Sequence, residues 1–414
     1  MEQADTSTSG TMTDVRPRRH PTVGNERHPL LILGGGIGGL AAALALAQHG
    51  MKSHVIEKRK VYEPEGAGIQ IGPNGSRLLA SLGVADALEP LAGKPDLIHA
   101  RDSATGATLA RLPLGGWIAK RHGAPYWVLH RADLHQALFD AARASPLIAR
   151  TTDFDAIAVE NRGEHVVVRS RSSGEIEGSA MIAADGIRSM VRDEFFAGKP
   201  LRFAGKCAAR AVIPATAMPK SLAENATGLW MSPKAHVVHY PVRGGSEVAL
   251  VFVRNETAAS DDWSASLQSS WVTEPARAFA KSLRDLLDVP AEWKKWSLYE
   301  LPPLPTWVRG NICLLGDAAH PTLPFLAQGG VLAIEDAAVL ARMIARRPDD
   351  ICQGFTLYER ERRPRATRVV AAAKSNGSIY HLDGFLAQAR NAAMRISPPE
   401  MLMARYDWIY GYRA

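Results

Sequence analysis

A polar loop with paired glycines is the part of the chain best suited to chemistry. The run Gly316–Gly330 reads GDAAHPTLPFLAQGG, follows a strand-like apolar stretch and precedes a helical pattern over Val331–Ile344. Asp317 would project from the end of the strand, while Gly329 and Gly330 would let the backbone approach a ligand, because glycine has no Cβ. The N-terminus of the following helix would add free N–H groups and a partial positive charge of about half a unit. These features predict a site for an anion or a cofactor.

A second glycine cluster lies near the beginning of the chain. Residues 34–39 read GGGIGG, match the pattern GxGxxG, and lie between a short apolar strand and an Ala- and Leu-rich helix. Gly34 would permit the tight turn, Gly36 the close approach of a pyrophosphate, and Gly39 the packing of the helix on the strand. Glu57 ends the next predicted strand, where a carboxylate can accept hydrogen bonds from an adenosine ribose. Together they predict a dinucleotide site, and the acid favours a ribose without a phosphate, as in FAD or NAD.

Two further segments carry charged residues that could contact a cofactor. Residues 183–192 read AADGIRSMVR and place Asp185 at a turn, while residues 129–134 read LHRADL and place Arg131 at the predicted start of a helix. An arginine suits a phosphate group. Taken alone, however, Asp-Gly is an ordinary turn and Arg131 an ordinary surface residue. Only the neighbouring motifs favour a role of either residue in binding a cofactor.

These segments together resemble the motifs of the flavin-dependent aromatic hydroxylases, the class A FAD monooxygenases with the para-hydroxybenzoate-hydroxylase fold. The family motifs GxGxxG, DGxxSxxR and GDAAHxxxPxxGxG occur here in the family's order. The third motif ends in Ala327-Gln328-Gly329-Gly330 instead of a simple GxG. This variant is typical of the branch that contains salicylate hydroxylases and 3-hydroxybenzoate 6-hydroxylases. The resemblance extends from about Pro29 to the end of the chain.

The resemblance implies bound FAD, with NADH or NADPH as a transient co-substrate, since the sequence has a single GxGxxG fingerprint. The glycine-rich loop at residues 66–75 would lie beside the isoalloxazine ring and move with it. The implied reaction is hydroxylation of a phenol or a salicylate- or hydroxybenzoate-like acid by NAD(P)H and O2 through a flavin C4a-hydroperoxide. The residues expected to contact FAD are Gly34, Gly36, Gly39, Glu57, Gly68, Ile69, Arg131, Asp185, Asp317, Pro324, Gly329, Gly330 and Val331.

A strand-like segment in the second half of the chain offers a catalytic base. Residues 235–241 read AHVVHYP, so His236, Val238 and Tyr240 would share one face of a strand and His239 the other. A histidine, with an ordinary pKa near 6.5, can take a proton from a phenol near neutral pH. Relatives that act on hydroxybenzoates resemble this chain at both positions. We therefore expect His236 to act as the base and Tyr240 to assist it; a polar pair between neighbouring strands is the alternative.

Three other residues allow more than one interpretation. Arg210 could contact the flavin, bind a substrate carboxylate, or form a buried ion pair. His320 belongs to the GDAAH motif and more plausibly shapes the flavin loop than acts as a base. Pro324 occupies a position where some hydroxybenzoate-specific relatives carry a polar side chain, so the resemblance does not by itself transfer their specificity.

Composition narrows the class of protein. The chain has 414 residues, 49 Lys and Arg against 42 Asp and Glu, and three scattered cysteines without a CxxC pair. The excess of arginine is spread along the chain, which favours attraction of anionic small molecules over nucleic acid. The cysteines favour the reducing cytoplasm and no metal site. Residues 29–48 are uncharged and nearly as long as a membrane span, but their strand–turn–helix pattern indicates a buried β-turn-α unit. A homodimer is expected on base rates alone.

The predicted fold is α/β: a Rossmann-like FAD-binding domain interleaved with a mostly antiparallel β-sheet substrate domain, and a helical C-terminal region. One continuous strand is expected over residues 177–184. The predicted division is a disordered tail at 1–28, FAD-binding segments at 29–97, 115–204 and 305–345, a substrate-domain hairpin at 98–114, the substrate domain at 205–304, and the C-terminal helical region at 346–414.

Two other functions fit the same motifs. A FAD-dependent tailoring monooxygenase or epoxidase acting on a larger natural product would need no phenol base. A flavin-binding redox sensor would bind FAD without turnover.

Overall fold

The computed structural model describes residues 28–61, 68–259 and 265–414. The predicted tail therefore lies outside the described residues except for His28, as do Gly66 and Ala67 of the predicted flexible loop.

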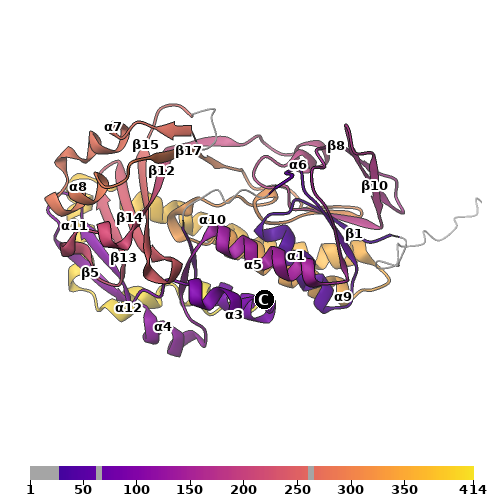
Figure 1. The fold of residues 1–414 in the computed structure, drawn as a ribbon, viewed down its shortest axis with the longest axis horizontal. Coiled ribbons are helices and arrows are strands. Elements are labelled where there is room, and N and C mark those ends of the chain that lie inside the picture. The colour runs from indigo at the N-terminus through magenta and orange to yellow at the C-terminus, as the bar shows by residue number, and fades with distance from the viewer. Residues whose placement is uncertain (1–27, 62–67, 260–264) are drawn as a thin grey trace, which may run out of the picture.

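A six-stranded sheet within the described residues forms one half of the molecule, on the right in Figure 1. Five strands run parallel and β18 closes one edge in the antiparallel direction. The two strands in the middle of the sheet consist only of apolar residues, as expected for parallel strands that are covered on both faces. In spatial order the strands are β18 (Val308–Arg309), β19 (Ile312–Leu314), β11 (Ala180–Ala183), β1 (Leu30–Leu33), β2 (Ser53–Ile56) and β7 (Ile148–Thr151).

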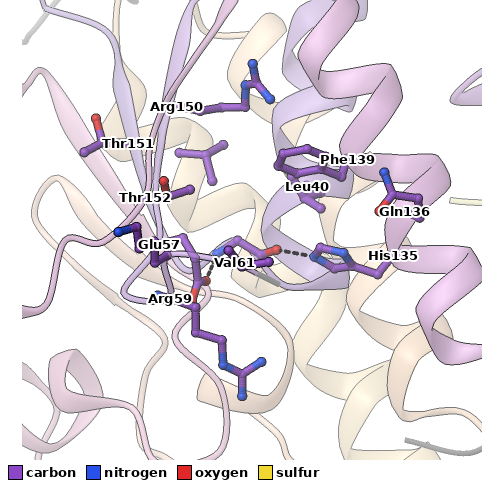
Figure 2. Close-up of a pocket in the computed structure, with 13 residues that line it drawn as sticks. Leu40, Glu57, Arg59, Val61, His135, Gln136, Phe139, Arg150, Thr151 and Thr152 are labelled. Atoms are coloured by element: carbon purple, nitrogen blue, oxygen red, sulfur yellow. Dashed lines mark hydrogen bonds between the residues drawn. The ribbon is translucent and has the colours of Figure 1, made fainter. Parts of the chain in front are cut away.

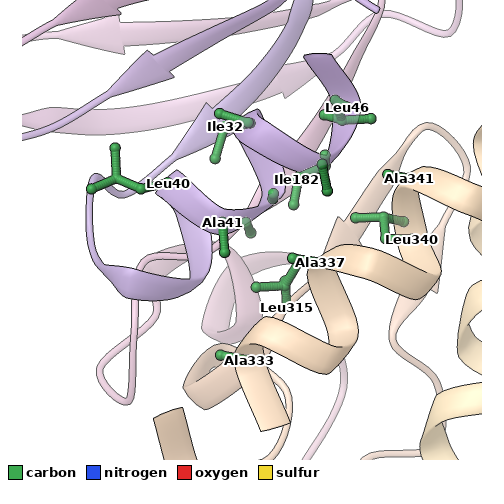
Figure 3. Packing of buried hydrophobic residues seen from close by; sticks show 14 of the residues in the cluster. Ile32, Leu40, Ala41, Leu46, Ile182, Leu315, Ala333, Ala337, Leu340 and Ala341 are labelled. Carbon is green, nitrogen blue, oxygen red and sulfur yellow. The ribbon is translucent and has the colours of Figure 1, made fainter. Parts of the chain in front are cut away.

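Helices α1 (Ile37–Gln48) and α9 (Gly329–Ala345) pack against each other beside this sheet. Figure 3 shows Ala41 of α1 and Ala333 and Ala337 of α9 at the contact. Small side chains allow the two backbones to approach closely. On its other flank α1 contacts α5 (Arg131–Ala144). Residues 29–48 are thus the predicted β-turn-α unit, and no helix among the described residues could cross a membrane.

An eight-stranded sheet, on the left in Figure 1, forms the other half of the molecule. Apart from the parallel pair β4–β13, all its neighbouring strands are antiparallel. The β4–β5 hairpin comes from the early part of the chain, so the two halves are interleaved as the sequence predicted. In spatial order the strands are β16 (Ala265–Leu267), β17 (Trp293–Glu300), β12 (Arg202–Pro214), β15 (Glu247–Asn255), β14 (Ala235–Val242), β13 (Ala226–Ser232), β4 (Leu97–Asp102) and β5 (Thr108–Pro113).

The single strand expected over residues 177–184 is wrong. The chain forms β10 (Glu175–Gly178), which pairs with β9 (Val166–Ser170) and β8 (Ala156–Asn161), and then passes into β11 of the central sheet. A Cβ on Gly178 would lie 2.5 Å from Pro29 O and 2.4 Å from Leu31 Cγ. The glycine thus lets the chain cross closely over β1 between the two sheets, and continuous strand propensity does not reveal this crossing.

The glycine-rich segment at residues 66–75 is regular where the structure describes it. Residues Gly68–Ile71 form β3, which pairs with β6 (Trp127–His130), and Pro73–Ser81 form α2. The expectation of a loop through residue 75 is therefore wrong. Glycine serves here for close packing, because a Cβ on Gly75 would meet Val331 of α9 at 2.9 Å.

The remainder of the chain is helical, as predicted. The long helix α10 crosses the middle of the molecule in Figure 1 and packs on α9. The C-terminal helices are α10 (Ile351–Tyr380), α11 (Gly384–Ile396), α12 (Pro399–Ala404) and α13 (Asp407–Tyr410). Shorter helices are α3 (Ala85–Leu88), α4 (Gly115–His122), α6 (Met190–Phe195), α7 (Ser270–Thr273) and α8 (Lys281–Leu287), with the 3-10 turns η6 (Gly316–Ala318) and η7 (Pro324–Leu326) on the GDAAH loop.

A buried network of charges connects α9 to α10 and to the GDAAH loop. Arg362 is fully buried, and its guanidinium lies 2.7 Å from Asp336 Oδ1 and 2.8 Å from Glu335 Oε2. His320 Nε2 is 2.6 Å from Asp336 Oδ2, which also accepts a hydrogen bond from the Gly316 N–H. Burial raises the pKa of Asp336, but His320 and Arg362 outweigh it and lower that pKa to about 2. Asp336 is therefore ionised and holds the loop in place.

Arg362→Met should destabilise the protein strongly. The variant removes the buried cation that Asp336 and Glu335 share and leaves them, among the described residues, only His320 and Arg365 as ion-pair partners; removing one partner of a buried ion pair costs about 3–5 kcal/mol. Urea unfolding of the wild type and the variant measures the difference. Arg346→Met is the control: Arg346 is exposed at the end of α9, and its loss should change stability by no more than about 0.5 kcal/mol. Equal effects of the two substitutions would contradict the role given to the buried network.

Candidate functional site

The N-terminus of α1 forms a tight turn against β1. Gly34 has φ +111°, and a Cβ on Gly39 would lie 1.9 Å from Gly34 O. Both glycines are therefore required by conformation or packing, as the sequence predicted. Gly36 differs, because no atom of the described residues lies within 4 Å of its Cβ position and the residue lines a cleft. The structure thus leaves open space where a phosphate would approach the free N–H groups of the helix.

A pocket with about 760 Å³ of open space lies on one side of this turn (Figure 2). Glu57 Oε2 accepts a hydrogen bond from the Gly35 N–H at 2.7 Å, and His135 Nε2 lies 2.7 Å from Gly35 O. The sequence singled out Glu57 but not the rest of the lining, to which Arg59, Phe139 and Arg150 belong. An aromatic ring, aliphatic side chains, cations and one carboxylate suit an adenosine with its ribose.

A larger cleft, with about 1340 Å³ of open space, lies on the other side of the turn. It reaches from Gly36, at the nucleotide-binding sheet, to β14 and β15 of the eight-stranded sheet. Gly35 lines the pocket and Gly36 the cleft, so the two spaces meet at the α1 N-terminus. Of the residues predicted to bind the cofactor, those that line the cleft are Gly36, Gly68, Ile69, Arg131, Asp317, Pro324, Gly329 and Gly330.

The N-terminus of α9 faces this cleft. No side chain caps it, and the N–H groups of Gly329, Gly330 and Val331 have no hydrogen-bond partner among the described residues. Val331 contributes only its backbone there, because its side chain is buried against Gly75 of α2. A Cβ on Gly330 would meet Ile69 Cδ1 at 2.6 Å, so this glycine lets β3 pack on the helix.

Asp185 lies at the edge of the cleft between two lining residues, Ala184 and Gly186. Its Oδ2 accepts a hydrogen bond from the Val191 N–H at 3.3 Å, while its buried Oδ1 has no partner among the described residues. Burial raises the pKa of Asp185. An unpartnered buried oxygen of this kind fits a hydroxyl group of a bound cofactor.

The elongated shape, the two free helix N-termini and the unpartnered Asp185 oxygen together fit FAD. The pocket at Glu57 would hold the adenosine, the α1 N-terminus and Arg131 the pyrophosphate, and the α9 N-terminus the isoalloxazine ring. When bound, FAD accepts a hydride from NAD(P)H and activates O2.

His236 and Tyr240 share one face of β14, as predicted, and both line the cleft with Val238 between them. The ring of His239 lies on the opposite face against Gly228, where a Cβ would be 2.0 Å from Nε2. The two side chains have different hydrogen-bond partners. Tyr240 donates a hydrogen bond to Gly68 O at 3.0 Å, whereas His236 Nδ1 lies 2.7 Å from Nε2 of His381.

Burial is the main cause that lowers the pKa of His236 well below its usual value, and the nearby His381 and Lys206 lower this pKa further. The imidazole is therefore neutral at neutral pH and has a free lone pair. Burial also raises the pKa of Tyr240, so that its hydroxyl stays protonated and can donate.

Arg210 on β12 lines the cleft near Tyr240. Its guanidinium carbon lies 3.8 Å from the ring centroid of Trp296, its buried Nε has no hydrogen-bond partner, and no carboxylate of the described residues pairs with it. Burial lowers the pKa of Arg210 to about 10, which still leaves it charged at neutral pH. The buried ion pair is thus not formed by the described residues, and the group is available to a ligand.

The structure gives His320 the structural role that the sequence favoured, through its contact with Asp336. Pro324 begins η7 and lines the cleft, where it supplies shape and no hydrogen-bonding side chain. The sequence missed His381, because 145 residues separate it from His236 and no local pattern marks it.

Comparison with known proteins agrees with this geometry. A family model described as FAD binding domain matches residues 27–373. The 3-hydroxybenzoate 6-hydroxylase of Polaromonas naphthalenivorans (strain CJ2) is 35% identical over 385 residues, which cover 93% of this chain and 96% of that protein. The 6-hydroxynicotinate 3-monooxygenase of Pseudomonas fluorescens is 34% identical over 352 residues, with coverage of 84% and 90%. The crystal structure of Klebsiella pneumoniae HpxO complexed with FAD and uric acid superimposes with a TM-score of 0.80 at 25% identity, covering 91% of this chain and 95% of HpxO.

The family model spans most of the chain, the relatives match it almost end to end, and the fold is the predicted α/β fold with an interleaved antiparallel sheet. The prediction of FAD as cofactor, with NAD(P)H as co-substrate, is confirmed with it. The chain belongs to the FAD-binding-domain family of flavin-dependent aromatic hydroxylases.

Proposed function

We propose that this protein is a FAD-dependent monooxygenase that uses NAD(P)H and O2 to hydroxylate an aromatic acid bearing a ring hydroxyl. One observation carries the proposal: a neutral buried histidine, a tyrosine hydroxyl and an unpaired arginine converge on the same cleft as the free N-terminus of α9. A base beside a cation matches a phenol that also carries a negative group.

The cation suggests the substrate class. Arg210 is charged, desolvated and without a carboxylate partner among the described residues, which is costly unless an anion binds. The two relatives described above are named for rings that carry both a hydroxyl and a carboxylate. We therefore assign the substrate carboxylate to Arg210, and its hydroxyl to the β14 face.

His236 supplies the base. Electrophilic hydroxylation requires an electron-rich ring, and loss of the phenolic proton raises the electron density of the ring. With a lowered pKa, His236 holds an unprotonated nitrogen across the neutral range. Transfer of the proton to it would give an imidazolium beside a phenolate, and this attraction offsets the cost of charging a buried ring.

Tyr240 and the apolar lining position the ring. The tyrosine hydroxyl is anchored to Gly68 O, at the strand next to the flavin site, and can accept a hydrogen bond from a ligand. Val238, Val251 and Val253 present aliphatic surface beside it. Such a lining excludes water from the reaction.

The FAD contacts at the predicted residues remain predictions, as do the domain boundaries, the cytoplasmic location and the homodimer. Support for the FAD contacts is that Glu57 lines the pocket and eight of the other predicted residues line the cleft. Support for the cytoplasm comes from the three cysteines, which are all free thiols.

The direct test is oxidation of NADH and of NADPH by the FAD-loaded protein with hydroxybenzoates, hydroxynicotinates and simple phenols, with products identified. We expect a hydroxylated product from a ring that carries both groups. Stimulation only by bulky compounds without a phenol would favour a tailoring monooxygenase. No stimulation by either class, with FAD bound, would favour a redox sensor.

Glu57→Ala should weaken FAD binding. Loss of a hydrogen bond to a charged group costs about 1.5–3 kcal/mol, or about 10- to 100-fold in Kd. Fluorescence titration of the apoprotein measures this Kd. Glu89→Ala is the control, since Glu89 is exposed and, among the described residues, forms an ion pair with Lys94 alone. Equal affinity of the Glu57 variant and the control would remove Glu57 from the cofactor site.

His236→Ala should lower the hydroxylation rate by about 100-fold or more at pH values below the pKa of the substrate's own hydroxyl. Above that pKa the substrate arrives deprotonated, so the loss should shrink. Steady-state rates across pH 6 to 10 measure the effect. His49→Ala, at an exposed position, should keep the wild-type profile. A profile of His236→Ala parallel to the wild type would exclude His236 as the base.

Arg210→Met keeps an unbranched side chain on β12 and removes the charged group that lies over Trp296. We expect kcat/KM for a hydroxybenzoate to fall about 10- to 100-fold, while kcat/KM for the same phenol without its carboxylate changes little. Arg202→Met, exposed on the same strand, is the control. An equal loss for both substrates would assign Arg210 to the flavin instead.

A further inference from the structure

The ring nitrogen of His236 that faces away from the cleft has a partner of its own. His236 Nδ1 lies 2.7 Å from Nε2 of His381, which caps the C-terminus of α10. Phe325 and Tyr380 enclose the His236 ring edge to face, with ring centroids 5.4 and 5.3 Å away. The ring is thus fixed in orientation, and its other nitrogen, Nε2, has no hydrogen-bond partner among the described residues.

Between two neutral imidazoles one nitrogen must donate and the other must accept, and the next residues decide which. His381 Nδ1 lies 3.2 Å from Asn255 Oδ1, and Lys206 Nζ lies 2.7 Å from the same oxygen. Lysine only donates, so the amide atom that faces it must be the oxygen. Asn255 Oδ1 is then an acceptor for His381 as well, and His381 carries its proton on Nδ1.

The proton position on His381 in turn decides the proton position on His236, which lines the cleft. With its proton on Nδ1, His381 has a bare Nε2 that can only accept. His236 must therefore donate from Nδ1, which leaves His236 Nε2 bare. The order of donors is fixed from the ammonium of Lys206 to the ring in the cleft.

We propose that Lys206, Asn255 and His381 are positioning residues that hold His236 in the tautomer with a bare Nε2 facing the substrate. The tautomer itself does not depend on the proposed function; only the role of Nε2 as proton acceptor for the substrate rests on it. In that step the substrate O–H bond breaks, an Nε2–H bond forms, and phenolate and imidazolium result.

The sheet places three of the four residues. Lys206 of β12 and Asn255 of β15 are cross-strand partners, and His236 of β14 is paired with Val253, two residues before Asn255. The fourth, His381, comes from the helical region and is partly exposed. The chain of contacts therefore joins the eight-stranded sheet to the end of α10.

The surrounding charges keep both rings neutral. Lys206 from β12 and Arg390 from α11 face His381; burial first, and then these two cations, lower its pKa to about 4. On the cleft side Arg210 of β12 and Tyr240 of β14 are near His236. No carboxylate among the described residues pairs with either histidine. Both rings are thus neutral throughout the neutral range, where the same order of donors and acceptors applies.

Nitrogen-15 NMR of the FAD-loaded protein, labelled in histidine, tests the tautomers directly at pH 7.5. The signals that disappear in His236→Gln belong to His236, and those that disappear in His381→Phe belong to His381. We expect both rings to carry the proton on Nδ1, with Nε2 shifts typical of a bare nitrogen. A protonated Nε2 on His236 would overturn the proposal. This measurement needs no substrate, so it is independent of the proposed function.

Variants of His381 separate tautomer control from packing. Phe retains the ring volume but neither nitrogen, whereas the amide of Gln can accept from His236 and donate to Asn255. We expect His381→Phe to give mixed tautomers on His236 and His381→Gln to preserve the single one. Tyr380→Phe, which keeps its ring against His236, is the control and should also preserve it. If His381→Phe kept the wild-type tautomer, the proposal would be wrong.

Lys206→Met provides a second variant if His381→Phe does not fold. Without the ammonium the amide of Asn255 can turn over, so the His236 tautomers should mix. Removing the nearby positive charge should also raise the pKa values of both histidines, which moves the acid limb of kcat/KM to higher pH. An unchanged tautomer in this variant would overturn the proposal.

Turnover with 3-hydroxybenzoate as probe completes the test. We expect His381→Phe to lower kcat about 10-fold with little change in KM, and His381→Gln to restore most of it. A single His236 tautomer in the wild type without turnover of any compound would reject the proposed function and leave the proton order standing. Turnover that depends on His236 but not on His381 would reject the positioning role alone.

Discussion

The rest of the structure depends on a pair of acids that is buried in α9 and neutralised from α10. Glu335 and Asp336 are adjacent and fully buried, so each must find a cation or a donor. Arg362 serves both, and Arg365 binds Glu335 through two nitrogens at 2.7 and 2.8 Å. Breaking such a buried network costs more free energy than its formation contributes to stability. The network therefore mainly specifies one arrangement of the helices.

That arrangement decides where the cofactor site lies. Asn74 of α2 donates to Glu335 at 2.8 Å and to Gln328, the residue at the α9 N-terminus, at 2.9 Å. Asp336 holds the GDAAH loop through Gly316 and His320. The α9 N-terminus is thereby fixed beside the N-terminus of α1, and both direct free N–H groups at the same cleft. Two positive helix ends facing one space provide what an anionic cofactor requires.

The eight-stranded sheet completes the cleft with side chains from β12 and β14. Its register places His236 and Tyr240 on the open face of β14 and Arg210 on β12 near them. The Tyr240 ring packs on Gly68, where a Cβ would lie 2.3 Å from Cε2, so the sheet touches the nucleotide-binding half at a position that only glycine allows. The close contact of the Tyr240 ring with Gly68 thus helps to bring the reacting groups next to the cofactor groups.

The sequence by itself determined the fold class, the family and the motifs that line part of the cleft. Local rules suffice for these, since the GxGxxG turn, the strand alternation around His236 and the helix start at Gly329 are each readable within a few residues. Tertiary structure alone decided the rest. The chain crossing at Gly178, the close packing at Gly75 and the contact of His236 with His381 depend on segments that are distant in sequence. The tautomer of His236 is likewise undefined until Lys206, Asn255 and His381 meet, because a hydrogen bond needs both of its partners in place.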